Sequence, residues 1–210
     1  LARLCAKVGA DVTEVAYGMG LDTRIGTHFL RAGLGYGGSC FPKDTSALTE
    51  LARRNGVHLS LLDAVQQINE SQPAWFVTQL KAVIPDLSQT RIAVLGLSFK
   101  PETDDLREAA SLRLIPLLLQ EGAQLVAFDP LVNDRVSEMF ADVEFVSDPY
   151  EALDQADCAL LVTEWKVCVE LDFSRVKNLM RRPLLFDGRN AWPLDTLRQL
   201  GFTYLGVGRA

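Results

Sequence analysis

The stretch Arg91-Ile92-Ala93-Val94-Leu95-Gly96 decides the fold class, because a new periodicity begins there. A short apolar run that contains β-branched residues and ends at a glycine predicts a buried strand. Before this stretch the pattern is helical, and after it short strands alternate with short helices. Pro85–Thr90, just upstream, therefore marks a boundary. We expect two regions, residues 1–87 and 88–210.

Five further apolar runs follow the first one, each separated from the next by a helical stretch or a turn. They predict strands at Gln124–Pro130, Val143–Val146, Cys158–Thr163, Pro183–Asp187 and Thr203–Val207. The helices between them are expected at Ala110–Gln120, Asp134–Phe140, Tyr150–Gln155, Phe173–Met180 and Leu194–Leu200. Strands that alternate with helices imply an α/β fold built on a Rossmann-like, mainly parallel, doubly wound sheet.

Upstream of the boundary the elements are all predicted to be helical. Helices are expected over residues 1–20 with a break at Gly9, over Asp44–Arg54, and from Ser60 to about Ile84. Asp11 begins a capping-box pattern for the second part of the first stretch. Pro73 lies inside the last helix, so it is expected to kink or restart that helix.

The composition is that of an ordinary globular protein, with 210 residues, a net charge of -6 and 48% hydrophobic residues. The acidic balance argues against a nucleic-acid partner, and no apolar run is long enough to span a membrane. Leu1 is not a methionine and lies within a helical pattern, so we expect part of a longer cytoplasmic chain. The cysteines fit neither a zinc site nor a disulfide framework, and no metal is expected: Cys5, Cys40, Cys158 and Cys168.

The densest group of chemically useful residues is Gly33-Leu34-Gly35-Tyr36-Gly37-Gly38-Ser39-Cys40-Phe41-Pro42-Lys43-Asp44. Its glycines permit positive φ angles and let a ligand approach the main chain. Cys40 stands just ahead of the predicted helix and near Lys43. A thiol at a helix N-terminus beside a cation is stabilised as the nucleophilic thiolate. A lone cysteine is also often a small buried hydrophobe, so these residues alone leave both interpretations open.

Two of the predicted strands lead into charged segments. Parallel sheets bind ligands beyond the carboxyl ends of their strands. The first strand leads into a segment that holds Lys100 and Arg107, and the fifth leads into one that holds Arg189. Only Gly96 is present where a dinucleotide fingerprint would need three glycines, so this half is not predicted to be the NAD site. Lys100 and Arg107 are equally compatible with a solvated charge cluster.

Four blocks, in the same order, resemble the UDP-glucose/GDP-mannose dehydrogenase family, and the cysteine segment is most similar to its UDP-glucose 6-dehydrogenase branch. These blocks are Leu21–Gly26, Gly33–Asp44, Leu95–Glu108 and Phe186–Asn190. The resemblance covers nearly the whole chain. It implies that residues 1–87 form the central, dimerising helical domain and that residues 88–210 form the domain that binds a UDP-sugar. The family's NAD-binding domain, with a catalytic lysine and asparagine, would lie upstream of Leu1.

The resemblance also implies a reaction, the NAD-dependent oxidation of a sugar C6 alcohol to a carboxylate. The intermediates would be a thiohemiacetal and a thioester on a cysteine, which Cys40 matches. Asp44 matches a carboxylate that positions water and moves protons. With UDP-glucose the product would be UDP-glucuronate, and this chain alone would be inactive without the NAD domain. The alternatives are a GDP-mannose 6-dehydrogenase and a non-catalytic module that binds nucleotide sugars and dimerises.

The same resemblance implies the binding residues. The UDP-sugar would be bound by Arg24, Phe29, Leu30, Gly37, Lys100 and Arg189. NAD would lie close to Lys43 and Arg107. A UDP-sugar carries two phosphate charges, which arginine and lysine are suited to neutralise. The expected partners are thus the UDP-sugar and a second copy of the chain, with Arg24 reaching the substrate of that copy.

Overall fold

The computed structural model describes residues 1–209. Its centre is a six-stranded sheet in the order β3-β2-β1-β4-β5-β6. The strands are β1 (Arg91–Leu95), β2 (Gln124–Phe128), β3 (Val143–Phe145), β4 (Cys158–Leu161), β5 (Leu184–Asp187) and β6 (Thr203–Gly206). Every neighbouring pair is parallel. The predicted α/β, doubly wound fold is confirmed, and the strand order reverses direction between β1 and β4.

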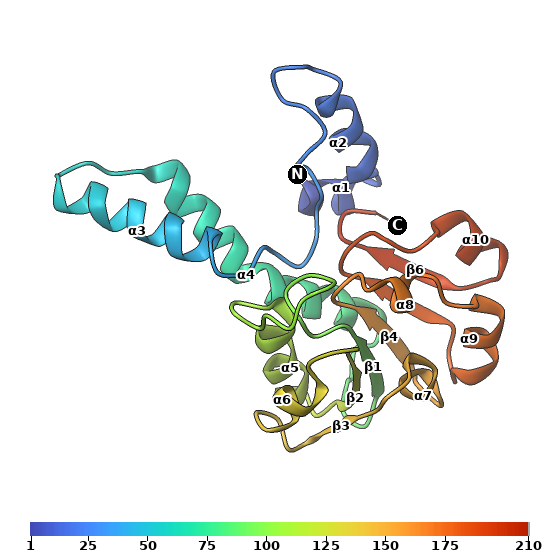
Figure 1. Ribbon diagram of the computed structural model, residues 1–210. Helices are drawn as coiled ribbons and strands as arrows, with labels where there is room; N and C mark the ends of the chain where they lie inside the picture. Colours follow the sequence, from blue (N-terminus) through green and yellow to red (C-terminus); the bar gives the residue numbers. More distant parts are fainter. Residues whose placement is uncertain (210) are drawn as a thin grey trace.

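Helices cover both faces of the sheet because alternate residues of each strand point to opposite sides. Ile92 and Val94 of β1 belong to one hydrophobic core, and Ala93 and Leu95 belong to the other. The first face is covered by α4 (Ser60–Val83), α5 (Ala110–Gln120) and α6 (Asn133–Ser137). The second is covered by α7 (Pro149–Leu153), α9 (Phe173–Leu179) and α10 (Leu194–Gln199). Figure 1 shows this arrangement.

The helical region before the sheet contains α1 (Ala2–Val8), α2 (Val12–Gly20), α3 (Phe41–Arg54) and the start of α4. In Figure 1, α3 and the first half of α4 form a hairpin that projects from the sheet. The second half of α4 belongs to the sheet's core, where Phe76, Val77 and Leu80 are buried. The long helix therefore joins the projecting hairpin rigidly to the α/β unit, while the division at residues 87 and 88 stays a prediction.

The expected start of one helix is wrong, and the restart that was one of two alternatives for Pro73 does not occur. The helix α3 begins at Phe41 rather than Asp44, because Pro42 is accommodated in the first turn, where no backbone N–H is needed. Pro73 does not restart α4, which runs as one helix from Ser60 to Val83. Pro73 is itself buried within this helix.

The remaining elements were predicted to within a few residues, with one exception. The short helix α8 (Lys166–Val169) was not predicted. Gly9 ends α1 in the left-handed conformation, as the predicted break requires. Asp11 is the N-cap of α2, but it accepts a hydrogen bond from the Thr13 N–H at 2.8 Å and not from Glu14. Among residues 1–209 the expected Asp11–Glu14 capping box is therefore replaced by a simple N-cap.

The two ends of the described chain meet beside β6. The Val12 N–H donates to the Gly208 carbonyl at 2.8 Å, and Arg209 pairs with Asp11 at 3.4 Å. Figure 1 shows the N- and C-terminal ends close together. No helix within residues 1–209 has both the length and the apolar character needed to cross a bilayer. The same residues contain no group of three or more histidine, cysteine or acidic side chains placed to hold a metal ion.

Candidate active site

The glycine-rich loop, residues 33–40, runs from the ends of the strands to the start of α3. Leu34 is fully buried, and its N–H donates to the Gly188 carbonyl at 3.0 Å. The Tyr36 N–H donates to Asn69 Oδ1 on α4 at 2.8 Å, and the Asn69 amide returns a bond to the Tyr36 carbonyl at 3.0 Å. The loop is therefore fastened both to α4 and to the carboxyl edge of the sheet.

Two glycines of this loop are required by close packing. A Cβ on Gly37 would collide with the Glu108 carbonyl, and a Cβ on Gly38 would lie 2.7 Å from the Phe99 ring. Gly38 also has a φ of +85°, which side chains rarely adopt. Its N–H donates to the Arg107 carbonyl at 2.8 Å. The glycine-rich loop thus lies directly against the segment that follows β1, as a chain with side chains at these positions could not.

Cys40 is the N-cap residue of α3 and is exposed. Its Sγ lies 3.6 Å from Ser39 Oγ, and its carbonyl accepts the Asp44 N–H at 2.8 Å. The thiol therefore stands at the positive end of a 14-residue helix, where negative charge is favoured. The pKa of Arg107 is raised, mainly by its hydrogen bond to Asp105. The nearby Cys40 thiol makes the smallest contribution in the same direction. Cys40 and Arg107 therefore lie within electrostatic reach of each other.

The charged residues beside Cys40 form short-range pairs. Lys43 Nζ lies 3.2 Å from Asp44 Oδ1, and both side chains are largely exposed. Arg107 Nη2 lies 2.7 Å from Asp105 Oδ2. The Arg107 guanidinium and backbone N–H together lower the pKa of Asp105 to about 2, so this carboxylate is ionised at neutral pH. Lys43, Asp44 and Arg107 are exposed, whereas the Asp105 side chain is mostly covered.

A second group lies at the other end of the glycine-rich loop. Arg189 follows β5 and donates through Nε to Glu164 Oε2 at 2.6 Å. A Cβ on Gly33 would lie 3.7 Å from Arg189 Nη1, so the guanidinium faces the first residue of the loop. Lys100 Nζ lies 5.5 Å from the centre of the Phe99 ring, which itself packs against Gly38. The loop therefore links Arg189 and Lys100 to Cys40.

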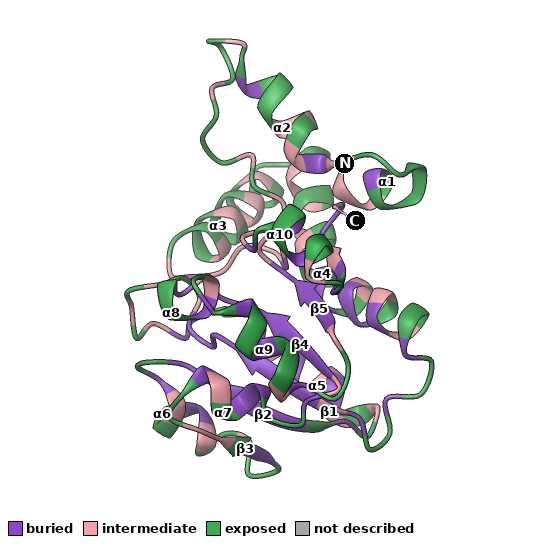
Figure 2. Ribbon diagram, turned by 90° about the vertical axis from the view of Figure 1, so that its right-hand side faces the viewer, coloured by how far each residue is buried: buried purple, intermediate pink, exposed green. Residues whose placement is uncertain are grey.

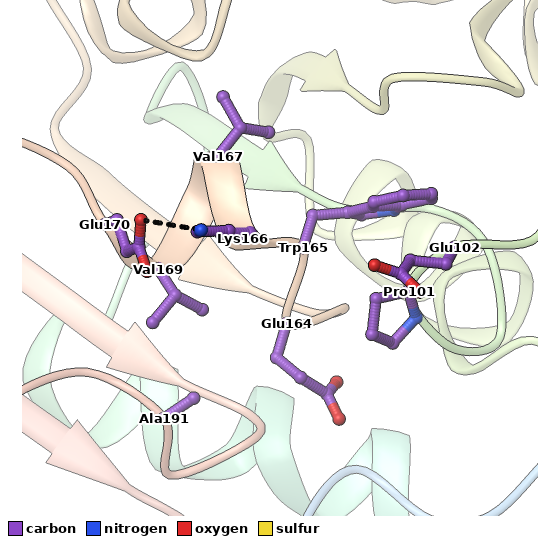
Figure 3. Close-up of a pocket in the computed structure, with 9 residues that line it drawn as sticks. All are labelled: Pro101, Glu102, Glu164, Trp165, Lys166, Val167, Val169, Glu170 and Ala191. Carbon is purple, nitrogen blue, oxygen red and sulfur yellow. Dashed lines mark ion pairs between the residues drawn. The ribbon is translucent and has the colours of Figure 1, made fainter.

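An open pocket of about 600 Å³ adjoins this second group, beyond the carboxyl end of β4. It is lined by Pro101, Glu102, Glu164, Trp165, Lys166, Val167, Val169, Glu170 and Ala191 (Figure 3). The pocket lies near the point where the strand order reverses, where doubly wound sheets bind ligands. Its walls combine apolar side chains with a few charged groups, as small-molecule sites do.

The structure does not bring all predicted site residues together. Arg24 pairs with Asp22 at 2.6 Å, on a turn that Figure 1 places at the end of α2 away from the sheet. Phe29 is exposed, has a φ of 61°, and makes an edge contact with Phe41 at 5.9 Å. Leu30 is half-buried. Gly37, Lys100 and Arg189 lie along the glycine-rich loop, with Lys43, Asp44 and Arg107 at its Cys40 end.

Two acidic residues at the carboxyl edge were not predicted from the sequence. Glu164 was identified only from its ion pair with Arg189 in the structure. Asp129 is buried after β2 and accepts bonds from the Leu97 N–H at 2.7 Å, the Ser98 N–H at 3.0 Å and Trp165 Nε1 at 2.9 Å. An Asp-Pro pair directly after a strand was the available signal for it.

These contacts also test whether NAD fits the sheet of this chain. In dinucleotide-binding sheets, an acidic residue after the second strand binds the ribose. Here the Asp129 carboxylate is already occupied by Leu97, Ser98 and Trp165. A Cβ on Gly96 would lie 2.5 Å from Thr163, so the turn after β1 is filled by protein. The crevice of this sheet therefore does not suit a dinucleotide.

Comparison with known proteins finds two domain models of one family in this chain. Residues 1–71 match the central domain of the UDP-glucose/GDP-mannose dehydrogenase family, and residues 93–193 match its UDP binding domain. UDP-glucose 6-dehydrogenase of Pseudomonas aeruginosa is 44% identical over the whole chain, which covers 48% of that protein. UDP-glucose 6-dehydrogenase TuaD of Bacillus subtilis is 42% identical over the whole chain, which covers 46% of it.

A solved structure is similar as well. The UDP-glucose dehydrogenase of Pyrobaculum islandicum superimposes with a TM-score of 0.85 at 35% identity, over 97% of this chain and 45% of that one. The chain thus spans about half the length of the relatives it matches. Both matching models belong to one family, and the fold agrees with that of a solved UDP-glucose dehydrogenase. The chain belongs to the UDP-glucose/GDP-mannose dehydrogenase family.

Proposed function

We propose that this chain is the cysteine-bearing and UDP-sugar-binding part of an NAD-dependent UDP-glucose 6-dehydrogenase. The observation that carries the proposal is the exposed Cys40 thiol at the N-terminus of α3, on a loop whose other end meets Arg189. This arrangement puts a nucleophile and a cation for phosphate on one continuous segment. The names of the relatives support UDP-glucose as the sugar nucleotide.

Cys40 acts on the aldehyde stage of the C6 oxidation. Its thiolate adds to the aldehyde carbon, and the carbonyl oxygen takes a proton, which gives a thiohemiacetal. NAD⁺, when bound, supplies the hydride acceptor of the oxidation. Loss of the C6 hydride to the bound cofactor and of the hydroxyl proton to solvent would convert the thiohemiacetal into the thioester. Water then adds to the carbonyl carbon, the C–S bond breaks, and the carboxylate leaves with the thiolate restored, while the two protons of the water pass to solvent through Asp44. The positive end of α3 stabilises the thiolate before attack and after release.

Asp44 is the group proposed to hold water and exchange protons during thioester hydrolysis. It lies in the first turn of α3, and its backbone N–H bonds to the Cys40 carbonyl, so both residues share one turn. Its side chain is exposed beside Lys43. A carboxylate one turn from the nucleophile is suited to general base catalysis.

The UDP-sugar is proposed to contact both regions of the chain. Arg189 and Lys100 neutralise the diphosphate, and the main chain at Gly37 approaches the ligand closely. Phe29 and Leu30 border it upstream of the glycine-rich loop. Arg24 is proposed to reach the substrate of a second copy of the chain, which accords with its position on a distant, exposed turn.

NAD is proposed to lie on the Cys40 side of the glycine-rich loop, near Lys43 and Arg107. Both are exposed cations, and each is suited to a phosphate of the cofactor. The crevice of the sheet is filled, as described above, so most of the cofactor's contacts belong to protein outside this chain. A free, exposed thiol such as Cys40 is typical of a reducing compartment, and we place the protein in the cytoplasm.

The experiment is calorimetric titration of the chain with UDP-glucose, GDP-mannose and NAD⁺ in separate runs. UDP-glucose is expected to bind, and Arg189→Ala is expected to weaken it by about tenfold or more, because a charge-assisted contact is lost. Arg175→Ala is the matched control, since Arg175 stacks on Tyr150 at 3.8 Å, away from the glycine-rich loop. Preference for GDP-mannose would contradict the assignment of the sugar nucleotide.

A further inference from the structure

Arg189 and Glu164 form the most sheltered ion pair within residues 1–209, with side chains 19% and 26% exposed. Nε donates to Oε2 at 2.6 Å and Nη2 donates to Oε1 at 3.3 Å. The pairing of β4 with β5 brings them together, because Leu161 lies opposite Asp187 and the two charged residues follow soon after. A two-point contact of this kind fixes the direction of a guanidinium.

The backbone of Arg189 is held by other groups. Its N–H donates to Asp187 Oδ1 at 3.0 Å. The next residue, Asn190, exchanges two bonds with Val207, at 3.0 and 2.9 Å. The turn is therefore fixed without Glu164. What Glu164 controls is the direction of the arginine side chain.

The donors of Arg189 divide into two sets. Nε and one N–H of Nη2 are used on Glu164, which leaves three of the five N–H groups of a guanidinium. Nη1 is on the side of Gly33, and among residues 1–209 it has no hydrogen-bond acceptor. The free Nη1 group therefore faces the start of the glycine-rich loop that leads to Cys40.

We propose that Glu164 is a positioning residue that holds the Arg189 guanidinium ready for the diphosphate of the nucleotide sugar, which rests on the proposed function. An unpaired arginine samples many rotamers and loses that freedom when a ligand orders it. With Glu164 in place, the ordering is complete before the ligand arrives. Glu164 also occupies the Nε–H and one N–H of Nη2, so the other three N–H groups of Arg189 are the ones available to phosphate oxygens.

The test is calorimetric titration of the 210-residue chain with UDP. Glu164→Ala is expected to weaken binding about fivefold, the cost of ordering one long side chain. The UDP affinity of Glu164→Gln is expected to lie between those of the wild type and Glu164→Ala, because the glutamine amide oxygen still accepts one hydrogen bond from Arg189. In an Arg189→Ala background, Glu164→Ala is expected to add no further loss, since Glu164 acts only through Arg189.

Glu170→Gln is the matched control. Glu170 lines the same pocket, but its partner is Lys166 at 3.8 Å. Figure 3 shows the Glu164 carboxylate on a different side of the pocket from this pair. UDP affinity is expected to be unchanged in Glu170→Gln. An equal change in UDP affinity in both variants, whether a gain or a loss, would mean that Glu164 has no role beyond that of any acidic residue in the pocket, and would overturn the proposal.

A ligand-free readout separates this proposal from the proposed function. The Nε–H of Arg189 is expected to give a protected NMR signal in the wild-type chain that is lost in Glu164→Ala. A signal that survives, or UDP binding as tight in Glu164→Ala as in the wild type, overturns the positioning role. Failure of the wild-type chain to bind UDP would instead overturn the proposed function, while the Nε–H signal would still decide whether Glu164 holds the side chain.

Discussion

Cys40 differs from the other three cysteines of the chain in its surroundings. Cys5, Cys158 and Cys168 are buried, whereas Cys40 is exposed at a helix N-terminus. Burial raises the pKa of Cys168 to about 12, and burial raises the pKa of Cys158 further still. A buried thiol is not accessible to a substrate or reagent, and of the four cysteines only Cys40 is exposed.

We therefore expect iodoacetamide to alkylate the native chain once, at Cys40, near neutral pH. Peptide mass spectrometry after brief exposure measures the site, and Cys40→Ser is expected to remove the labelling. Urea-unfolded chain, in which all four thiols are accessible, is the control. Early alkylation of Cys158 or Cys168 in the native chain would contradict the burial described above.

Asp187 shows how a buried carboxylate shapes the turn before Arg189. Its oxygens accept bonds from the Trp192 N–H at 2.7 Å, the Arg189 N–H at 3.0 Å and the Tyr204 hydroxyl at 3.1 Å. Burial nevertheless raises the pKa of Asp187, because desolvation outweighs these bonds. All of these partners donate hydrogen bonds, so each side-chain oxygen of Asp187 acts as an acceptor.

Asp187→Asn is expected to destabilise the chain by about 2 kcal/mol, because an amide N–H₂ would face a backbone donor. Since the folded-state pKa is raised, ionisation of Asp187 favours unfolding, and its contribution is largest below its ordinary pKa. The stability difference between wild type and variant should therefore shrink as the pH rises between about 3 and 7. Urea denaturation across this range measures it, with exposed Asp142→Asn as control. A difference that grows with pH would show the opposite sign.

Among the elements, the glycine-rich loop depends most on close backbone approach. Gly38→Ala combines a φ of +85° with a Cβ 2.7 Å from the Phe99 ring. Gly56→Ala is the matched control, because Gly56 has a φ of +72° and nothing within 4 Å of its Cβ. The control is expected to lose about 1 kcal/mol from backbone strain alone. Gly38→Ala should lose about 1–3 kcal/mol more from overpacking, measured by chemical denaturation. Equal losses of stability in the two variants would mean that the Phe99 ring moves aside at no cost in free energy.

The helices and strands could be predicted where local pattern and packing agree. The four inner strands are apolar runs because both faces of the sheet are buried there, so length and flanking turns were sufficient. The start of α3 and the continuity of α4 depend on how each helix accommodates a proline, which has no backbone N–H to donate. The packing around Pro42 and Pro73 decides this. The helix α8 is too short to show a period. Local sequence carries no signal for such cases.

At the scale of the whole molecule, the site could be predicted only in part. Cys40 and Arg189 were found because each stands in a motif that the family resemblance covers. Glu164 and Asp129 were not, because their partners lie far away in the sequence and meet them only through the order of the strands. Strand order is a property of the assembled sheet, and apolar runs alone do not specify it.

The final prediction concerns the projecting hairpin as the contact surface of the proposed homodimer. No residue of α3 is buried, and Leu48 and Leu51 on it are more than half exposed. Figure 2 draws α3 without a buried residue, in contrast to the strands. Leu61, at the start of α4, is 80% exposed. A large apolar surface of this kind is costly in water unless a partner covers it, and a second copy of the chain is the proposed partner.

Sedimentation velocity is expected to give a dimer for the wild-type chain and a monomer for Leu48→Glu combined with Leu51→Glu. Both leucines are exposed within one chain, so the fold should survive, and circular dichroism checks that it does. Leu131→Glu is the matched control, because Leu131 is similarly exposed but lies beside the sheet, away from the hairpin. A wild-type monomer, or a dimer that persists in the double variant, would mean that another surface, or none, joins two copies of the chain.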